Sequence, residues 1–147
     1  MFLDDLEPGL AFETASRTLS EEDIVAFARL YDPQPFHVDP AAAAASPYGG
    51  IIASGFHTML TAFALTLEAN VWNEASLGSP GMDDIRWLAP VRPGDTLSVR
   101  GEVLSVAPSR SRPDRGRAEI AYSVRNAQGV EVMRYRCIHI LARRQAT

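Results

Sequence analysis

The feature that most restricts the fold is an apolar segment that runs from Phe56 to about Trp72. If this segment is helical, apolar side chains lie on most of its faces, and Glu68 is its only carboxylate. A helix of this kind is stable when other structure surrounds it. It is also shorter than the roughly 20 apolar residues that a membrane span needs. The sequence therefore predicts a long helix buried inside the protein.

From Met82 onward the apolar residues recur with a period of two, which predicts strands. Turn residues at 93–95 and 126–129 are typical of hairpins, so neighbouring strands are expected to be antiparallel. Because helices come first and strands afterwards, we predict an α+β fold in which a curved antiparallel sheet wraps the central helix. The expected strand residues are Met82, Ile85, Trp87 and Leu88, then Leu97, Val99 and Val103, then Ile120, Tyr122 and Val124, and finally Val130, Val132, Met133, Tyr135, Cys137 and His139.

Two shorter helices are expected before the long one. Ser20 can cap the first, with Asp23 at capping-box spacing, and Pro33 stops it. Asp39 followed by proline marks the start of the second, which is short. The first helix has an apolar face with helical spacing, made of Ile24, Phe27, Ala28 and Tyr31.

Length and charge narrow the class of protein. A chain of 147 residues suits one domain, and we expect residues 1–147 to form it. All 14 basic residues are arginines, and the net charge of -4 disfavours general binding to nucleic acid. The lone Cys137 cannot form an internal disulfide, and the first residues do not resemble a signal peptide. We therefore expect a cytoplasmic protein without a membrane segment.

The stretch YDPQPFHVD places a carboxylate and an imidazole, Asp32 and His37, five residues apart. Pro33 and Pro35 restrict the backbone between them, which lowers the entropy lost in fixing the pair. A rigidly held Asp and His suit acid/base chemistry. The structural alternative is that Asp32 caps a loop and His37 is a packing residue.

A second candidate site lies where the long helix begins. Around Ser54 and Gly55, backbone N–H groups without partners and the positive end of the helix dipole meet a glycine, so an acceptor oxygen can approach closely. The alternative is a capped helix with a tight glycine contact. His57 is a candidate for lining the same pocket, or it is a core histidine.

These segments resemble the MaoC-like dehydratases, the family of (R)-specific enoyl-CoA hydratases with a hot-dog fold. The resemblance is carried by residues 20–39, by GGIIASGFHTM and by SPGMDDIRWLAPVRPGDTL, and it extends over about residues 5–142. The hydratase motif of that family falls on Asp32 and His37, with Gln34 where asparagine is common. The resemblance also implies that the Gly55 N–H holds the substrate carbonyl, with Ser54 and His57 as further candidate substrate contacts.

The implied reaction is the reversible hydration of a trans-2-enoyl thioester, carried by coenzyme A or an acyl carrier, to the (R)-3-hydroxyacyl thioester, a step typical of fatty acid metabolism. It needs a base for water, an acid for Cα and a stabilised enolate oxygen. The sequence leaves open which of Asp32 and His37 is the base; our hypothesis is that Asp32 is the base and His37 the donor. Neither a cofactor nor a metal is expected, since metal-ligand spacings are lacking.

Four arginines crowd residues 108–117, and Arg110 and Arg112 are candidates for contacting coenzyme A phosphates. A solvated hairpin tip is the alternative. We also expect a homodimer or a higher homo-oligomer, because a small curved sheet leaves an open edge and the long helix must be enclosed.

Two other functions compete with hydration. A hot-dog thioesterase would usually place a carboxylate on the long helix facing the thioester, whereas Glu68 lies more than three turns beyond Gly55. A non-catalytic acyl-binding partner subunit would keep Asp32 and His37 as relics.

Overall fold

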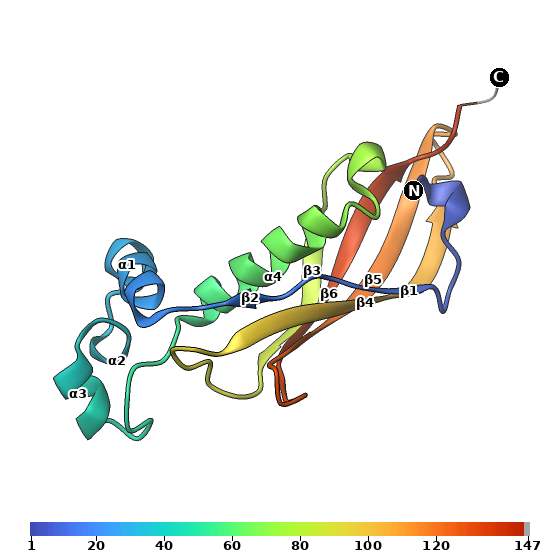
Figure 1. The fold of residues 1–147 in the computed structure, drawn as a ribbon. Helices are drawn as coiled ribbons and strands as arrows, with labels where there is room; N and C mark the ends of the chain where they lie inside the picture. Colours follow the sequence, from blue (N-terminus) through green and yellow to red (C-terminus); the bar gives the residue numbers. More distant parts are fainter. Residues whose placement is uncertain (146–147) are drawn as a thin grey trace.

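The computed structural model describes residues 1–145, and an antiparallel sheet dominates it (Figure 1). The strand order is β1-β4-β5-β6-β3, and β2 pairs with β4 beside this path. The long strands β4, β5 and β6 follow one another through hairpins, and β3 adds to the far side of β6. The strands are β1 (Ala11–Glu13), β2 (Arg17–Thr18), β3 (Gly81–Trp87), β4 (Thr96–Pro108), β5 (Arg115–Arg125) and β6 (Glu131–Ala142).

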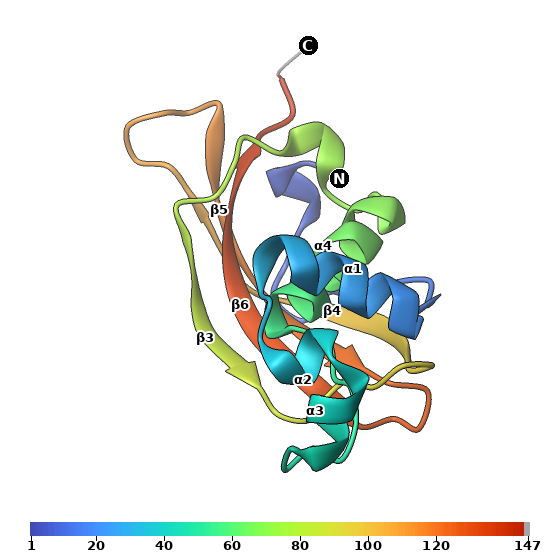
Figure 2. The same cartoon turned by 90° about the vertical axis from the view of Figure 1, so that its left-hand side faces the viewer.

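The helix α4 (Gly55–Ala69) lies along one face of this sheet, and three shorter helices gather at its N-terminal end (Figures 1 and 2). These are α1 (Glu21–Tyr31), α2 (Pro35–Val38) and α3 (Pro40–Ala45). The remaining elements of the described chain are two 3-10 helices, η1 (Leu3–Asp5) and η2 (Asn73–Ala75). The short helices therefore surround the positive end of the α4 dipole.

The core lies between α4 and the inner face of the sheet. Along β5, alternate residues are buried, as the period of two requires. Leu65 of α4 packs in the same cluster. This arrangement confirms the predicted α+β class and its hot-dog form, with a central helix against a curved antiparallel sheet. The buried strand residues include Leu97, Val99, Val103, Ala118, Ile120, Tyr122, Val124, Val132, Met133, Tyr135 and Leu141.

The capping signals of the short helices are confirmed. The Ser20 hydroxyl accepts the Asp23 N–H at 3.1 Å, and the Asp39 carboxylate accepts two N–H groups at the start of α3. Tyr31 departs from its predicted place on the buried face of α1, since it is 71% exposed. It occupies the last residue of the helix, where the chain turns away from the core.

The pairing of β3 differs from the prediction for the turn at residues 93–95. That turn does not join a hairpin, because β3 pairs with β6, whereas β4 pairs with β5 and the two N-terminal strands.

One face of α4 remains open in the single chain, with Phe56, Leu60 and Phe63 exposed. Among the helices of residues 1–145, none is long and apolar enough to cross a bilayer.

Candidate active site

A tight corner between α1 and α2 brings Asp32 and His37 together. Asp32 is the C-cap that directly follows α1, and its N–H still bonds the Ala28 carbonyl. Pro33 cannot continue the helix. The chain then turns, and Pro35 occupies the first position of α2, where its missing N–H costs nothing. The predicted stiff loop is thus partly a helical turn, which carries His37 back towards Asp32.

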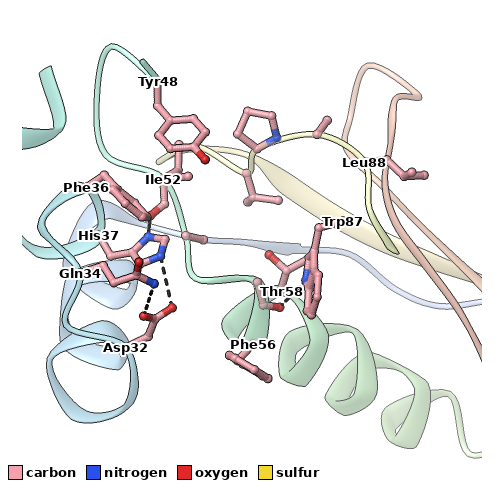
Figure 3. Close-up of a pocket in the computed structure, with 15 residues that line it drawn as sticks. Asp32, Gln34, Phe36, His37, Tyr48, Ile52, Phe56, Thr58, Trp87 and Leu88 are labelled. Atoms are coloured by element: carbon pink, nitrogen blue, oxygen red, sulfur yellow. Dashed lines mark hydrogen bonds and ion pairs between the residues drawn. The ribbon is translucent and has the colours of Figure 1, made fainter. Parts of the chain in front are cut away.

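The two side chains face each other across 3.3 Å, measured from Asp32 Oδ2 to His37 Nε2 (Figure 3). The other ring nitrogen of His37 lies 2.6 Å from the Ile52 carbonyl oxygen. A carbonyl only accepts, so Nδ1 carries the hydrogen and donates it there. Nε2 is therefore the atom of His37 that gains or loses a proton, and it points at the carboxylate.

Asp32 is held by further donors. Gln34 Nε2 donates to Oδ1 and the Ser54 hydroxyl donates to Oδ2, each at 2.7 Å. Partial burial by itself raises the pKa of Asp32, but these two hydrogen bonds and the positive charge of His37 outweigh it, so the net pKa is lowered. Asp32 is thus an ionised carboxylate in a fixed orientation, and Gln34 supplies the amide donor at the position where the motif departs from asparagine.

The N-terminus of α4 forms the opposite wall. Ser54 is the N-cap, and its hydroxyl oxygen also accepts the Phe56 N–H at 3.3 Å. The Gly55 N–H precedes the first carbonyl that the helix can offer as an acceptor, so the helix leaves it free for another oxygen. One serine therefore connects the carboxylate of the acid/base pair to the start of the helix.

Between these walls lies a cavity of about 400 Å³ (Figure 3). Asp32 and His37 supply a carboxylate and an imidazole at one side, and apolar and aromatic side chains supply most of the rest. A few convergent polar groups in an apolar pocket are typical of a small-molecule site. The lining residues are Asp32, Gln34, Phe36, His37, Tyr48, Ile52, Ala53, Gly55, Phe56, Thr58, Trp87, Leu88, Ala89, Pro90 and Val91.

The structure places the other predicted site residues elsewhere. His57 does not line this cavity; its ring stacks on Phe27 of α1, with centroids 4.5 Å apart. Burial lowers the pKa of His57, which suits a neutral packing residue. Arg110 and Arg112 lie in the hairpin after β4, a strand about 40 Å long that begins five residues beyond Val91 of the cavity lining. Their phosphate role stays a prediction, and within one chain they lie away from Asp32.

Among the cavity residues that the sequence interpretation did not predict, two are informative. Thr58, one turn into α4, is buried and lines the cavity, and helical spacing from Ser54 is the signal that could have indicated it. Trp87 was expected only as a strand residue without a role in a site, yet it lines the cavity and is 48% exposed. Among residues 1–145, no three His, Cys, Asp or Glu side chains gather closely enough to hold a metal ion.

Comparison with known proteins identifies the family. Residues 5–124 match the MaoC like domain. The chain belongs to the MaoC-like family. Its match covers both sides of the cavity, because Asp32, His37, Gly55 and Trp87 all fall within these residues.

Three proteins similar to this chain are informative. A MaoC-like dehydratase from Rhodospirillum rubrum has a crystal structure that superposes with a TM-score of 0.93 at 36% identity, covering 99% of both chains. The unliganded R-hydratase PhaJ1 from Pseudomonas aeruginosa gives 0.75 at 27% identity, covering 99% of this chain and 92% of that one. The 3-hydroxybutyryl-CoA dehydratase of Methylorubrum extorquens is 33% identical over 117 residues, which is 76% of this chain and 69% of that protein.

Proposed function

We propose that this MaoC-like protein catalyses the reversible hydration of a trans-2-enoyl thioester, carried by coenzyme A or an acyl carrier, to the (R)-3-hydroxyacyl thioester. The observation that carries the proposal is the Asp32–His37 pair, 3.3 Å apart, facing a cavity whose opposite wall is the N-terminus of α4. The names of the relatives, a 3-hydroxybutyryl-CoA dehydratase and an R-hydratase, support the same reaction class.

In the proposed hydration, Asp32 starts as the carboxylate and His37 as the imidazolium, with a proton on each ring nitrogen. Asp32 takes a proton from water as the water oxygen bonds to Cβ of the substrate, and His37 Nε2 delivers its proton to Cα on the same face. Asp32 then returns a proton to Nε2 across the 3.3 Å contact, so the enzyme ends as it began and one water has been added. The Nδ1–H bond to Ile52 keeps the imidazole in the orientation that this exchange needs.

The Gly55 N–H is proposed to receive the thioester carbonyl oxygen, on which negative charge develops as Cβ is attacked. Its free N–H and the dipole of α4 both favour negative charge at this point. Loss of one such donor typically costs 10²- to 10³-fold in rate. The Asp32–His37 pair therefore acts on the double bond of the enoyl thioester, and the Gly55 N–H acts on its carbonyl oxygen.

A thioesterase reading is disfavoured by the place of Glu68. This carboxylate pairs with Arg17 near the C-terminal end of α4, about 20 Å along the helix from Gly55. It does not line the cavity. A thioesterase would release free thiol from the substrate, whereas a hydratase removes only the enoyl absorbance, so one assay separates the two.

Asp32→Asn tests the proposal directly. The substitution keeps the shape but removes the base, so we expect hydration of crotonyl-CoA, followed by enoyl absorbance, to fall by about 10²- to 10⁴-fold. Glu22→Gln, an exposed carboxylate change on α1, is the matched control and should leave the rate unchanged. Near wild-type hydration by Asp32→Asn would exclude Asp32 as the base.

Two further points complete the proposal. We propose that a second copy of the chain covers the open face of α4, where Phe56, Leu60, Phe63 and Leu67 form an exposed stripe at helical spacing. We also propose that the protein works in the reducing cytoplasm, because Cys137 is a buried free thiol.

A further inference from the structure

Trp87 packs against Gly55 at the start of α4 so closely that a side chain at position 55 would clash with the indole. Its indole Nε1–H donates to the Gly55 carbonyl oxygen at 2.9 Å. A Cβ placed on Gly55 would lie 2.5 Å from Nε1 and 2.6 Å from Cε2 of the same ring. Since real Cβ contacts below 3.0 Å essentially never occur, position 55 must be glycine while the indole lies here.

A bulge in β3 changes the face to which its last residues point. Asp83 pairs with Arg136 and Arg86 with Arg134, so β3 advances three residues while β6 advances two. We place the bulge at Asp84, whose φ of +54° departs from extended strand geometry. Residues after the bulge therefore lie on the opposite face from the one that simple alternation would give.

The partly buried residues of β3 support this change of face. Met82 and Ile85 both pack against the core although they are three residues apart. Trp87 follows Ile85 by two and lies on the same side, towards α4. Without the bulge Trp87 would face away from the helix. Bulges beside functional sites commonly re-aim a side chain in this way.

The indole also borders the cavity beside the free N–H of Gly55. Its ring meets Phe56 edge-on, with centroids 5.9 Å apart, and both residues line the cavity opposite Asp32 and His37 (Figure 3). Gly55 and Trp87 both line this cavity, so a group bound at the Gly55 N–H has this ring in the neighbouring wall. The indole therefore restricts the direction of approach, and its hydrogen bond holds the first turn of α4.

We propose that Trp87 is a positioning residue: it fixes the first turn of α4 and directs the thioester carbonyl onto the Gly55 N–H. This inference rests on the proposed function. Because the oxyanion contact matters most in the transition state, loss of the indole should lower kcat more than it raises KM.

Single variants at Trp87 separate the ring from its N–H. Trp87→Ala removes the wall, and we expect kcat for crotonyl-CoA to fall on the order of tenfold, part of what loss of an oxyanion donor costs, with little change in KM. Trp87→Phe keeps a ring and should restore most of kcat. An unchanged kcat in Trp87→Ala would overturn the proposal, as would a loss confined to KM.

A double variant tests the contact itself. Gly55→Ala forces the new Cβ into the indole and should reduce kcat and the affinity for saturated butyryl-CoA, measured by calorimetry. Adding Trp87→Ala removes the clash, so the double variant should recover relative to Gly55→Ala alone. Independent roles would instead make the two losses multiply, which would overturn the inference.

Failure of the proposed function is distinguishable from failure of this inference. If wild type binds butyryl-CoA but does not hydrate crotonyl-CoA, the hydratase proposal fails, while recovery of affinity in the double variant still supports positioning of a thioester by Trp87. If wild type hydrates crotonyl-CoA and the losses multiply, the function stands and the positioning role is overturned. Circular dichroism of each variant confirms that the compared proteins are folded.

Discussion

Asp32 accepts hydrogen bonds from residues in separate segments, and this explains why a partly buried carboxylate stays charged. Gln34 belongs to the corner after α1, and Ser54 precedes α4. Each bond to a charged acceptor is worth about 1.5–3 kcal/mol, enough to offset the cost of partial burial. The corner and the long helix are therefore joined through one carboxylate.

The Ser54 hydroxyl should set the acid limit of activity. In Ser54→Ala a hydrogen bond that favours ionised Asp32 is lost, so the pKa of Asp32 rises. Because the proposed base must be ionised, the acid limb of the kcat/KM profile should move to higher pH, whereas the rate at neutral pH, where Asp32 stays ionised, should change much less. The measurement is hydration of crotonyl-CoA across pH 4 to 8.

Ser20→Ala is the control for this effect. Ser20 caps α1 through the same kind of bond that Ser54 makes to α4, so both variants lose about 1 kcal/mol of helix capping. Ser20 does not contact Asp32, and its variant should keep the wild-type pH profile. Equal profiles for both variants would contradict a specific role for Ser54.

The sequence was sufficient to single out Asp32, His37 and Gly55, because local motifs carry them, and the structure places all three in the lining of one cavity. It could not place Trp87, since the face to which that side chain points depends on an extra residue at Asp84 that pairing with β6 defines. His57 is a candidate from the sequence that does not line the cavity. Its place near the start of α4 follows from local sequence, but the direction of its ring depends on tertiary packing against Phe27.

Among the elements, those predicted well are the ones with local signals. The caps at Ser20 and Asp39 depend on neighbouring residues and are confirmed. The turn at residues 93–95 has ordinary hairpin chemistry, yet the strand before it pairs with β6. Strand pairing is set by the whole sheet, so turn residues alone could not decide it. The three-residue β1 and two-residue β2 were too short to show a period.

The buried polar contact between β5 and β6 predicts how stability depends on pH. Trp72 Nε1–H donates to the Tyr122 hydroxyl oxygen, so the hydroxyl is free to donate to His139 Nε2 at 2.8 Å. Burial lowers the pKa of His139 to about 4. The unfolded chain therefore takes up a proton near pH 6.5, where the folded protein does not.

The sign of the effect follows from this difference in proton uptake. The contribution of His139 is fully present above about pH 6.5 and is lost as pH falls towards 4, for a total of about 3 kcal/mol. His139→Gln keeps an acceptor for Tyr122 but does not titrate. Between pH 7 and pH 4, urea unfolding of wild type should therefore lose about 3 kcal/mol more than the variant. Because His57 is present in both proteins, its own titration cancels, and parallel curves would contradict the burial of a neutral His139.

At the scale of the whole molecule, the open face of α4 is the feature that a single chain leaves unexplained. The stripe of Phe56, Leu60, Phe63 and Leu67 runs the length of the helix beside the cavity residues at its start. Contiguous exposed apolar surface of this kind marks an interaction site. A helix predicted from sequence to be enclosed on all sides is enclosed on only part of its surface here, which is why we propose that a second copy of the chain supplies the cover.

We expect light scattering to give twice the 16.0 kDa chain mass, or an even multiple of it, at micromolar concentration. Leu60→Glu would bury a charge in the proposed interface and should weaken dimerisation by at least about 100-fold, a loss typical of interface hot spots, giving monomers on dilution. Leu104→Glu makes the same change at an exposed residue of β4 and should leave the mass unchanged. A wild-type monomer, or a Leu60→Glu variant of unaltered mass, would exclude this face as the interface.

Dissociation should also lower the rate of crotonyl-CoA hydration in Leu60→Glu, because Phe56 belongs both to the stripe and to the cavity lining. Leu60 itself does not line the cavity.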